Sequence, residues 1–422
     1  MKLLKLSLVA ALAAGALATT ASAVPLEEAI KDVDVSGFLR LRYTADEADK
    51  SVNNEKKKVS DAKWNIKSVI DFKAKVDDNF FAVAGVRYGN DGGATEYGYN
   101  SGSGNFGNDT YDNTADDQFD MYRAYIGYTV GNTTVQLGRQ NVFSFFTDDM
   151  YGDGLFVLNS DIQGLTLGAL WMDALEQDGD ISSNGLDAGE LLGDPTLKGQ
   201  DAIHVLTGKR VTDHDLYGVG AIGSYDPVSF QLWYAYLNDV VGLFAVELGA
   251  NFDVNDDVTV GLKGQYGFAN FDNGFADKVG IVDDSDFFGF EASAKVQFFD
   301  ISAGYVNYSA DDDESTSLSS FEDSGSFIKA GEELVDYALY SGKNDYWFVT
   351  AGVTIPDTGL RIGADYVDGS FGEDGDYDAS EVVARIDYKY NEKLNFKTWY
   401  SYIDQDSGDD DNRFRFEAKY SF

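Results

Sequence analysis

The feature that most constrains this chain is an alternation of apolar and polar side chains that recurs in nearly every segment. In residues 413–422, five apolar side chains alternate with five polar ones. A period of two residues is typical of a strand with one apolar face. The same period appears at 33–43, 62–76 and 380–390. Segments of about ten residues with this period are the signature of a transmembrane β-barrel.

The connections between these segments alternate in length, and this predicts how the strands are joined. Tight turns, such as 131–134 and 391–393, alternate with long segments rich in Gly, Asp, Asn and Ser, such as 89–117 and 310–344. Short periplasmic turns and long extracellular loops are the rule in outer-membrane barrels. Counting both kinds of connection predicts an all-β fold, an antiparallel barrel of about 18 strands. Such a barrel closes without a free edge and leaves an aqueous lumen.

The first 23 residues predict export of the protein. They contain Lys2, Lys5, an apolar stretch and the small-residue site Ala21-Ser22-Ala23, which together indicate a cleaved signal peptide. No run of about 18 apolar residues follows, so the sequence predicts no transmembrane helix. We therefore expect a signal peptide at 1–23 and a single barrel domain at 24–422 in the outer membrane of a Gram-negative cell.

Charge and cysteine content narrow the class further. Asp and Glu number 72 against 32 Lys and Arg, which gives a formal net charge of −40. This acidic excess argues against a nucleic-acid partner and suits either a solvating surface or a vestibule that attracts cations. The chain has no cysteine, so neither a disulfide framework nor a thiolate metal site is expected. We expect no cofactor to be required.

The same alternation places basic side chains in the lumen on the first four and the last four strands. Because the last strand of a closed barrel pairs with the first, these two groups would form one continuous basic wall. Arg139 is left out because strict alternation places it outward with Val135 and Leu137. The alternative is that the inward basic side chains only solvate the lumen and pair with inward Asp. The predicted wall consists of Arg40, Arg42, Lys63, Lys67, Arg87, Arg123, Arg361, Arg385, Lys397, Arg413 and Arg415.

Several stretches of the sequence resemble one known family. The signal MKLLKLSLVAALAAGA, the segment PLEEAIKDVDVSG, the GSYDP and QLWYAY parts of one hairpin, and ARIDYKYNEKLNFKTWYSY are similar to the Campylobacter-type (epsilonproteobacterial) major outer membrane porin family. The resemblance implies a homotrimer of 18-stranded barrels, each with its third loop folded into the pore. It also implies contact with outer membrane lipid and lipopolysaccharide, and makes the terminal Phe422 an assembly signal.

The third loop is expected to carry acidic side chains into this pore. The stretch TDDMYGDG (147–154) contains Asp148, Asp149 and Asp153. A basic wall on one side and this acidic loop on the other would produce a transverse field across the lumen. We expect such a field to order water and to favour small polar solutes over apolar solutes of equal size.

Two interpretations of the acidic stretch remain open. It is too short and irregular for an EF-hand loop, so it is either a turn-rich acidic loop or a site for a hard cation. The second interpretation is reasonable because carboxylates crowded in a narrow lumen repel one another and are stabilised by a divalent ion. The resemblance implies a structural Ca²⁺ near the constriction, with Asp153, Glu190 and Glu322 at the matching positions.

These observations predict a porin, a water-filled channel for passive diffusion of small hydrophilic solutes and ions. Weak cation selectivity is expected, because charge at the entrance and at the narrowest point acts most strongly on permeating ions. A solute-specific channel and an adhesive or structural barrel remain alternatives. An enzyme is not expected, because the two histidines, His204 and His214, lie in one long loop and neither is matched with a strand-end serine.

Overall fold

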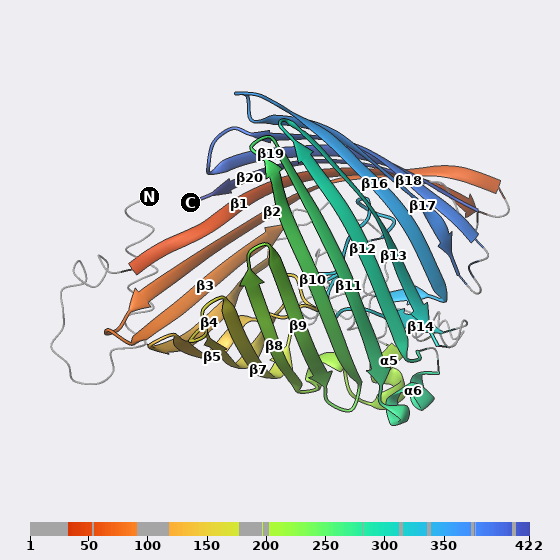
Figure 1. Cartoon of the computed structure of the whole chain (residues 1–422). Coiled ribbons are helices and arrows are strands. Elements are labelled where there is room, and N and C mark those ends of the chain that lie inside the picture. Colours follow the sequence, from red (N-terminus) through yellow and green to blue (C-terminus); the bar gives the residue numbers. More distant parts are fainter. Residues whose placement is uncertain are drawn as a thin grey trace.

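The first and last strands of the sheet pair with each other. Strand β1 (Val33–Val52) pairs with β2 (Glu55–Lys75) on one side and with β20 (Asp411–Ser421) on the other. The ring contains 18 strands, and Figure 1 shows them tilted around a common interior. The predicted antiparallel barrel of about 18 strands is therefore confirmed.

The computed structural model describes residues 33–52, 55–90, 118–176, 196, 202–280, 282–311, 315–335, 339–372, 375, 377–406 and 411–422. The other barrel strands are β3 (Phe80–Asn90), β4 (Gln118–Val130), β5 (Thr133–Asn141), β6 (Tyr151–Asn159), β7 (Leu165–Leu175), β8 (Leu216–Tyr225), β9 (Val228–Leu237), β10 (Val241–Asn255), β11 (Val258–Phe271), β12 (Ser285–Val296), β13 (Phe299–Ala310), β16 (Lys343–Ile355), β17 (Leu360–Phe371), β18 (Tyr377–Lys389) and β19 (Leu394–Gln405). The predicted signal peptide, residues 1–23, lies outside the described residues.

The long connections carry small elements that the alternation did not predict. A two-stranded sheet pairs β14 (Thr316–Leu318) with β15 (Leu339–Ser341) between β13 and β16. Two short helices, α5 (Ala202–Thr207) and α6 (Asn273–Val279), lie close together at the ends of the strands (Figure 1), and a single 3₁₀ turn, η2 (Val211–Asp213), precedes β8. None of the described helices is long and apolar enough to cross a membrane.

The outer face of the barrel carries the aromatic rows that the alternation predicted. Phe414, Tyr420 and Phe422 of the last strand region are each about 40% exposed, as expected for rings that face lipid. The backbones of Phe422 and Gly37 exchange two hydrogen bonds, of 3.0 and 3.2 Å. The β1–β20 ladder therefore extends to this last pair, so Phe422 takes part in closing the barrel.

Part of the inner face is apolar rather than polar. The inward side chains near the loop ends of β8 to β13 are fully buried, among them Leu216, Leu237, Leu243, Phe287 and Val306. They belong to one cluster that also contains side chains from two loops. These are L3 (142–150), between β5 and β6, and L7 (311–342), between β13 and β16. An apolar inner wall is stable here because both loops fold inward and cover it.

Replacing Phe422 with Ala should impair closure and assembly of the barrel. The ring lies 6.0 Å from that of Tyr420, and loss of such an aromatic pair costs about 1 kcal/mol besides the lost contact with lipid. The measurement is the fraction of heat-modifiable, folded barrel in the outer membrane. Phe422→Tyr, which keeps the ring, is the control; equal folded fractions in wild type and Phe422→Ala would contradict a role for this ring.

Candidate functional site

Loop L3 forms a compact unit inside the barrel. The N–H of Val142 donates to the carbonyl of Met150 across 2.8 Å, which closes the loop at its base. The hydroxyl of Thr147 donates to the carbonyl of Val142. Phe145 and Phe146 are buried, whereas Asp148 is exposed and Asp149 is half-buried. The loop therefore turns its aromatic side into the apolar cluster and its acidic tip toward the lumen.

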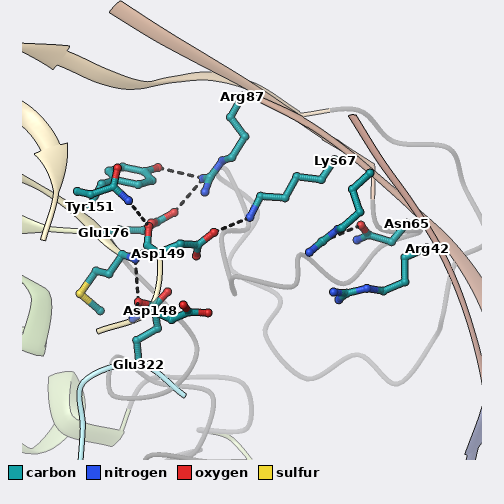
Figure 2. A network of polar contacts seen from close by, with 12 residues as sticks. Arg42, Asn65, Lys67, Arg87, Asp148, Asp149, Tyr151, Glu176 and Glu322 are labelled. Carbon is teal, nitrogen blue, oxygen red and sulfur yellow. Dashed lines mark hydrogen bonds and ion pairs between the residues drawn. The ribbon is translucent and has the colours of Figure 1, made fainter. Parts of the chain in front are cut away.

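The acidic tip reaches the opposite wall through one ion pair. Lys67 Nζ of β2 lies 2.8 Å from Asp149 Oδ2, and Figure 2 shows the lysine extending from the wall to the loop. Burial alone would raise the pKa of Asp149, but the Lys67 ammonium and its hydrogen bond outweigh it and lower the pKa below its usual value. Asp149 is therefore ionised at neutral pH, and this pair joins L3 to the basic wall.

A second cluster lies beside this pair. Arg87 of β3 forms ion pairs with Glu176 at 2.8 Å and with Asp120 at 3.0 Å, and donates to the Tyr151 hydroxyl at 3.1 Å. In Figure 2 the Arg87 side chain points toward Tyr151 and Glu176 from the wall. Glu176 is only 6% exposed, so the guanidinium compensates a buried carboxylate. This arrangement orders the wall on one side of the L3 tip.

The arginines of β1 and β4 also have partners. Arg40, which is 9% exposed, donates to Asn65 at 3.4 Å. Arg42 lies 3.0 Å from Glu417 of the neighbouring strand β20. Arg123 pairs with Asp71 at 2.8 Å. Arg42 and Arg123 thus have acidic partners on the wall itself, whereas Asn65, which accepts from Arg40, is neutral.

The arginines of β17 to β20 have acidic partners on the barrel and on L7. Arg361 pairs with Asp300 of β13, also on the barrel, at 2.5 Å. Arg385 pairs with Asp365 of β17 and lies 2.7 Å from Glu332 of L7. Arg413 pairs with Asp46 of β1 and with Glu333, the next residue of L7. L7 therefore crosses to the β18–β20 wall and places two carboxylates against it.

The remaining members of the predicted wall have fewer contacts. Arg415 lies 3.9 Å from Glu333 and its guanidinium stands 4.9 Å from the Trp399 ring. Within the part of the chain that the structure describes, Lys63 and Lys397 form no ion pair. Most of the arginines of the predicted wall thus lie beside acidic partners.

Most of these partner acids were not selected from the sequence. Asp71 could have been found, because it lies on the same face as Lys63 and Lys67 in the alternating pattern. Glu332 and Glu333 could not, because they lie in a long loop without any period. Their position depends on how L7 folds through the lumen.

Arg139 shows where strict alternation fails. It forms a bidentate pair with Asp153, at 2.7 and 2.8 Å, and its guanidinium lies 5.9 Å from the Tyr151 ring. The preceding Gly138 has φ of 128°, a conformation that interrupts a regular strand. Arg139 therefore joins the Tyr151 cluster, although the alternation had placed it outward.

The proposed calcium ligands do not form a ligand set in the described part of the chain. Asp153 pairs with Arg139, and Glu322 Oε2 accepts the N–H groups of Asp148 and Met150, each at 2.7 Å. Glu190 lies outside the described residues. Among the residues that are described, no group of three or more carboxylates or histidines could hold a metal ion. The Ca²⁺ site formed by Asp153, Glu190 and Glu322 therefore stays a prediction.

These contacts give the interior a clear organisation. Basic side chains line β17–β20 and β1–β4, and two inward loops bring acidic groups to this wall. A closed 18-stranded barrel with an interior of this kind defines an outer-membrane porin channel. The chain belongs to the Campylobacter major outer membrane protein family, whose model matches residues 1–420. The resemblance noted in the sequence is confirmed, and with it the outer-membrane location.

Solved structures from two other bacteria have a similar fold. Pseudomonas aeruginosa OccK9 (OpdG) is similar with a TM-score of 0.69 and 15% identity, over 93% of this chain and 100% of that one. Acinetobacter baumannii OccAB4 gives 0.67 and 13%, over 92% and 98%. P. aeruginosa OpdK, solved with vanillate, gives 0.65 and 17%, also over 92% and 98%. Curated protein sequences give no match.

Replacing Lys67 with Met should increase cation preference by removing the ammonium that faces Asp149. The cation-to-anion permeability ratio should rise about twofold, because a charge at the constriction acts strongly on permeating ions. As the pH falls, Asp149 becomes protonated and its contribution to cation preference is lost. In the variant this loss should occur at a higher pH than in the wild type, because Lys67 no longer lowers the pKa of that carboxyl. Reversal potentials in a planar bilayer, measured over a pH series, test both effects.

Lys63→Met is the matched control, because it removes the same charge from the same strand without breaking an ion pair to L3. Its effect should be smaller and should not alter the pH dependence. Equal shifts in the two variants would mean that the Lys67–Asp149 contact has no special weight at the constriction.

Proposed function

We propose that this porin is a water-filled channel for passive diffusion of small hydrophilic solutes and ions, with a weak preference for cations. The observation that carries the proposal is the L3 tip, where the exposed Asp148 and the ionised Asp149 stand at the wall of a polar lumen. At this level the carboxylates of L3 lie beside the cationic groups of Lys67 and Arg87. Small polar molecules can exchange water for such groups, whereas apolar ones cannot.

The direction of the ion preference follows from which charges are compensated. Arg42, Arg87 and Arg123 each pair with an acid on the barrel, and Arg385 and Arg413 pair with L7. The paired wall therefore contributes less positive field than its number of arginines indicates. The chain as a whole carries a formal charge of −40, and this excess favours entry of cations.

Replacing Asp148 and Asp149 together with Asn should lower the potassium-to-chloride permeability ratio about twofold, because the negative charge at the tip of L3 is lost. Arg413→Ser combined with Arg415→Ser should change the ratio in the opposite direction. Reversal potentials at 0.1 M and 1 M salt are the measurement. Both effects should shrink at high salt, where the Debye length falls from about 10 Å to about 3 Å.

The same recordings test the calcium hypothesis when they are made first in chelator and then in millimolar Ca²⁺. An ion bound near L3 would offset part of its negative charge and reduce the effect of the Asp148 and Asp149 changes. Anion selectivity of the wild type under both conditions would contradict the proposed cation preference, and the absence of any open channel would contradict the proposed function.

A solute-specific channel is the second candidate. The structure that favours it is OpdK with vanillate, although at 17% identity that similarity concerns the fold alone. Arg415 against the Trp399 ring is a contact that suits an aromatic carboxylate. Vanillate added to a conducting channel distinguishes the two functions, since a general diffusion pore is not blocked by it at submillimolar concentration.

We also propose that three barrels associate in the membrane, in contact with lipopolysaccharide. The support is the family resemblance together with large apolar side chains exposed on the outer face of β1 to β5, including Leu41, Trp64, Ile126 and Leu137. Native mass measurement in mild detergent should give about three times the mass of one mature chain. A particle of one chain at every detergent concentration would contradict the trimer.

A further inference from the structure

Loop L7 carries the two carboxylates that face the β18–β20 arginines, and the way it is held determines where they lie. Its segment 321–328 packs on L3, with Phe327 against Phe145 at 4.8 Å between ring centres. The N–H of Phe321 donates to Phe146, and that of Ser326 to Phe145, each across 2.7 Å. The middle of the loop is thus fixed to L3 and does not depend on the β18–β20 wall.

The next segment of L7 is held by a single buried carboxylate. Glu381 of β18 is 0% exposed and accepts hydrogen bonds from three consecutive backbone N–H groups, those of Glu332, Glu333 and Leu334, at 3.1 to 3.4 Å. The Ser401 hydroxyl donates to the same carboxylate at 2.6 Å. Successive backbone N–H groups form a concave site for an anion. Here a side chain of the barrel wall occupies that site.

The approach of L7 to Glu381 also requires a glycine. Gly331 has φ of 75°, and a Cβ at this position would lie 2.0 Å from Glu381 Oε2. No side chain other than hydrogen fits at that distance, so any larger residue must displace the loop. The carboxylate and the glycine together place Glu332 and Glu333 at the wall.

The two placed carboxylates contact the arginines of the wall. Glu332 lies 2.7 Å from Arg385, and Glu333 bonds Arg413 and lies 3.9 Å from Arg415. Arg385 belongs to β18, whereas Arg413 and Arg415 belong to β20, which pairs with β1 across the closure. Arg385 also pairs with Asp365 of β17, and Arg413 with Asp46 of β1. Without L7 in this position, these two arginines would keep their barrel partners, but the wall would lose the negative charge of Glu332 and Glu333.

We propose that Glu381 is a positioning residue for ion selectivity, which holds L7 so that Glu332 and Glu333 add their negative charge beside Arg385, Arg413 and Arg415. Glu381 itself is buried and does not meet the permeating ions. Its effect passes through the two loop carboxylates. The inference rests on the proposed function, since it assumes that ions pass this wall.

The test compares Glu381→Ala with the double variant Glu332→Gln/Glu333→Gln and with the combination of all three changes. Glu381→Ala should lower the potassium-to-chloride permeability ratio about twofold, as the double variant does, because both remove the negative charge of L7 from the arginine wall. In the double-variant background, Glu381→Ala should cause no further shift, since changes that act through one set of contacts are not additive. Reversal potential and single-channel conductance are read in the same planar bilayer.

Gly331→Ala provides an independent variant, because it displaces L7 without altering a barrel strand. It should shift selectivity in the same direction as Glu381→Ala. Gly280→Ala is its matched control: Gly280 has a similar φ of 72°, but a Cβ added there would have no other atom within 4 Å, so only local backbone strain is added. Heat-modifiable mobility confirms that each variant forms a barrel.

The possible results separate the inference from the function on which it rests. If the wild type forms no ion channel, the proposed function fails. If the wild type conducts but Glu381→Ala and Gly331→Ala leave its selectivity unchanged, only the role of Glu381 fails. An additional shift of the same size in the combined variant would show that Glu381 acts on ions directly and would overturn the positioning role.

Discussion

The hydrogen bonds between β1 and β20 are the interaction on which the rest of this molecule depends. A backbone N–H or C=O without a partner is very costly in lipid, so a sheet can span a membrane only if it has no free edge. The ladder from Ala48–Asp411 to Phe38–Ser421, extended by Gly37 and Phe422, removes that edge. Closure at 18 strands then produces two faces, one toward lipid and one toward an interior too wide for side chains alone to fill.

The two inward loops are the consequence of that wide interior. L3 and L7 bury their aromatic side chains against β10 to β13 and leave their acidic groups directed at the charged wall. Two buried carboxylates stabilise the loop backbones, Glu322 for L3 and Glu381 for L7, and each is satisfied by N–H groups. A buried carboxylate without such donors would be strongly destabilising, so the loops and these side chains depend on one another.

Charge pairing gives the lumen its character. Most inward arginines have an acidic partner, either on the barrel, as Arg123 has in Asp71, or on L7, as Arg413 has in Glu333. The field in the channel is therefore set by the few charges that are left over and by their position relative to the narrowest level. A small displacement of a loop changes which charges are left unpaired, even though the total number of charges stays the same. This is because ion pairing acts only over a short range in a water-filled lumen.

The sequence by itself determined the barrel, its strand number and the side on which most strand residues lie, because a spanning strand must alternate between lipid and water. Arg413 and Phe414 were assigned to opposite faces in this way, and the basic wall was found residue by residue. The alternation failed at Arg139, where Gly138 interrupts the strand. The alternation also predicted strands that are too short at β1 and β2. Their pairing continues to Val52 and Glu55, through a stretch whose sequence is rich in charged residues and does not alternate. The tertiary structure alone decided which acids meet the wall, since Glu332 and Glu333 belong to a loop without a period. Their position follows from the contact between Glu381 and Gly331. These two residues are far apart in the sequence and meet only when the barrel has closed around L7.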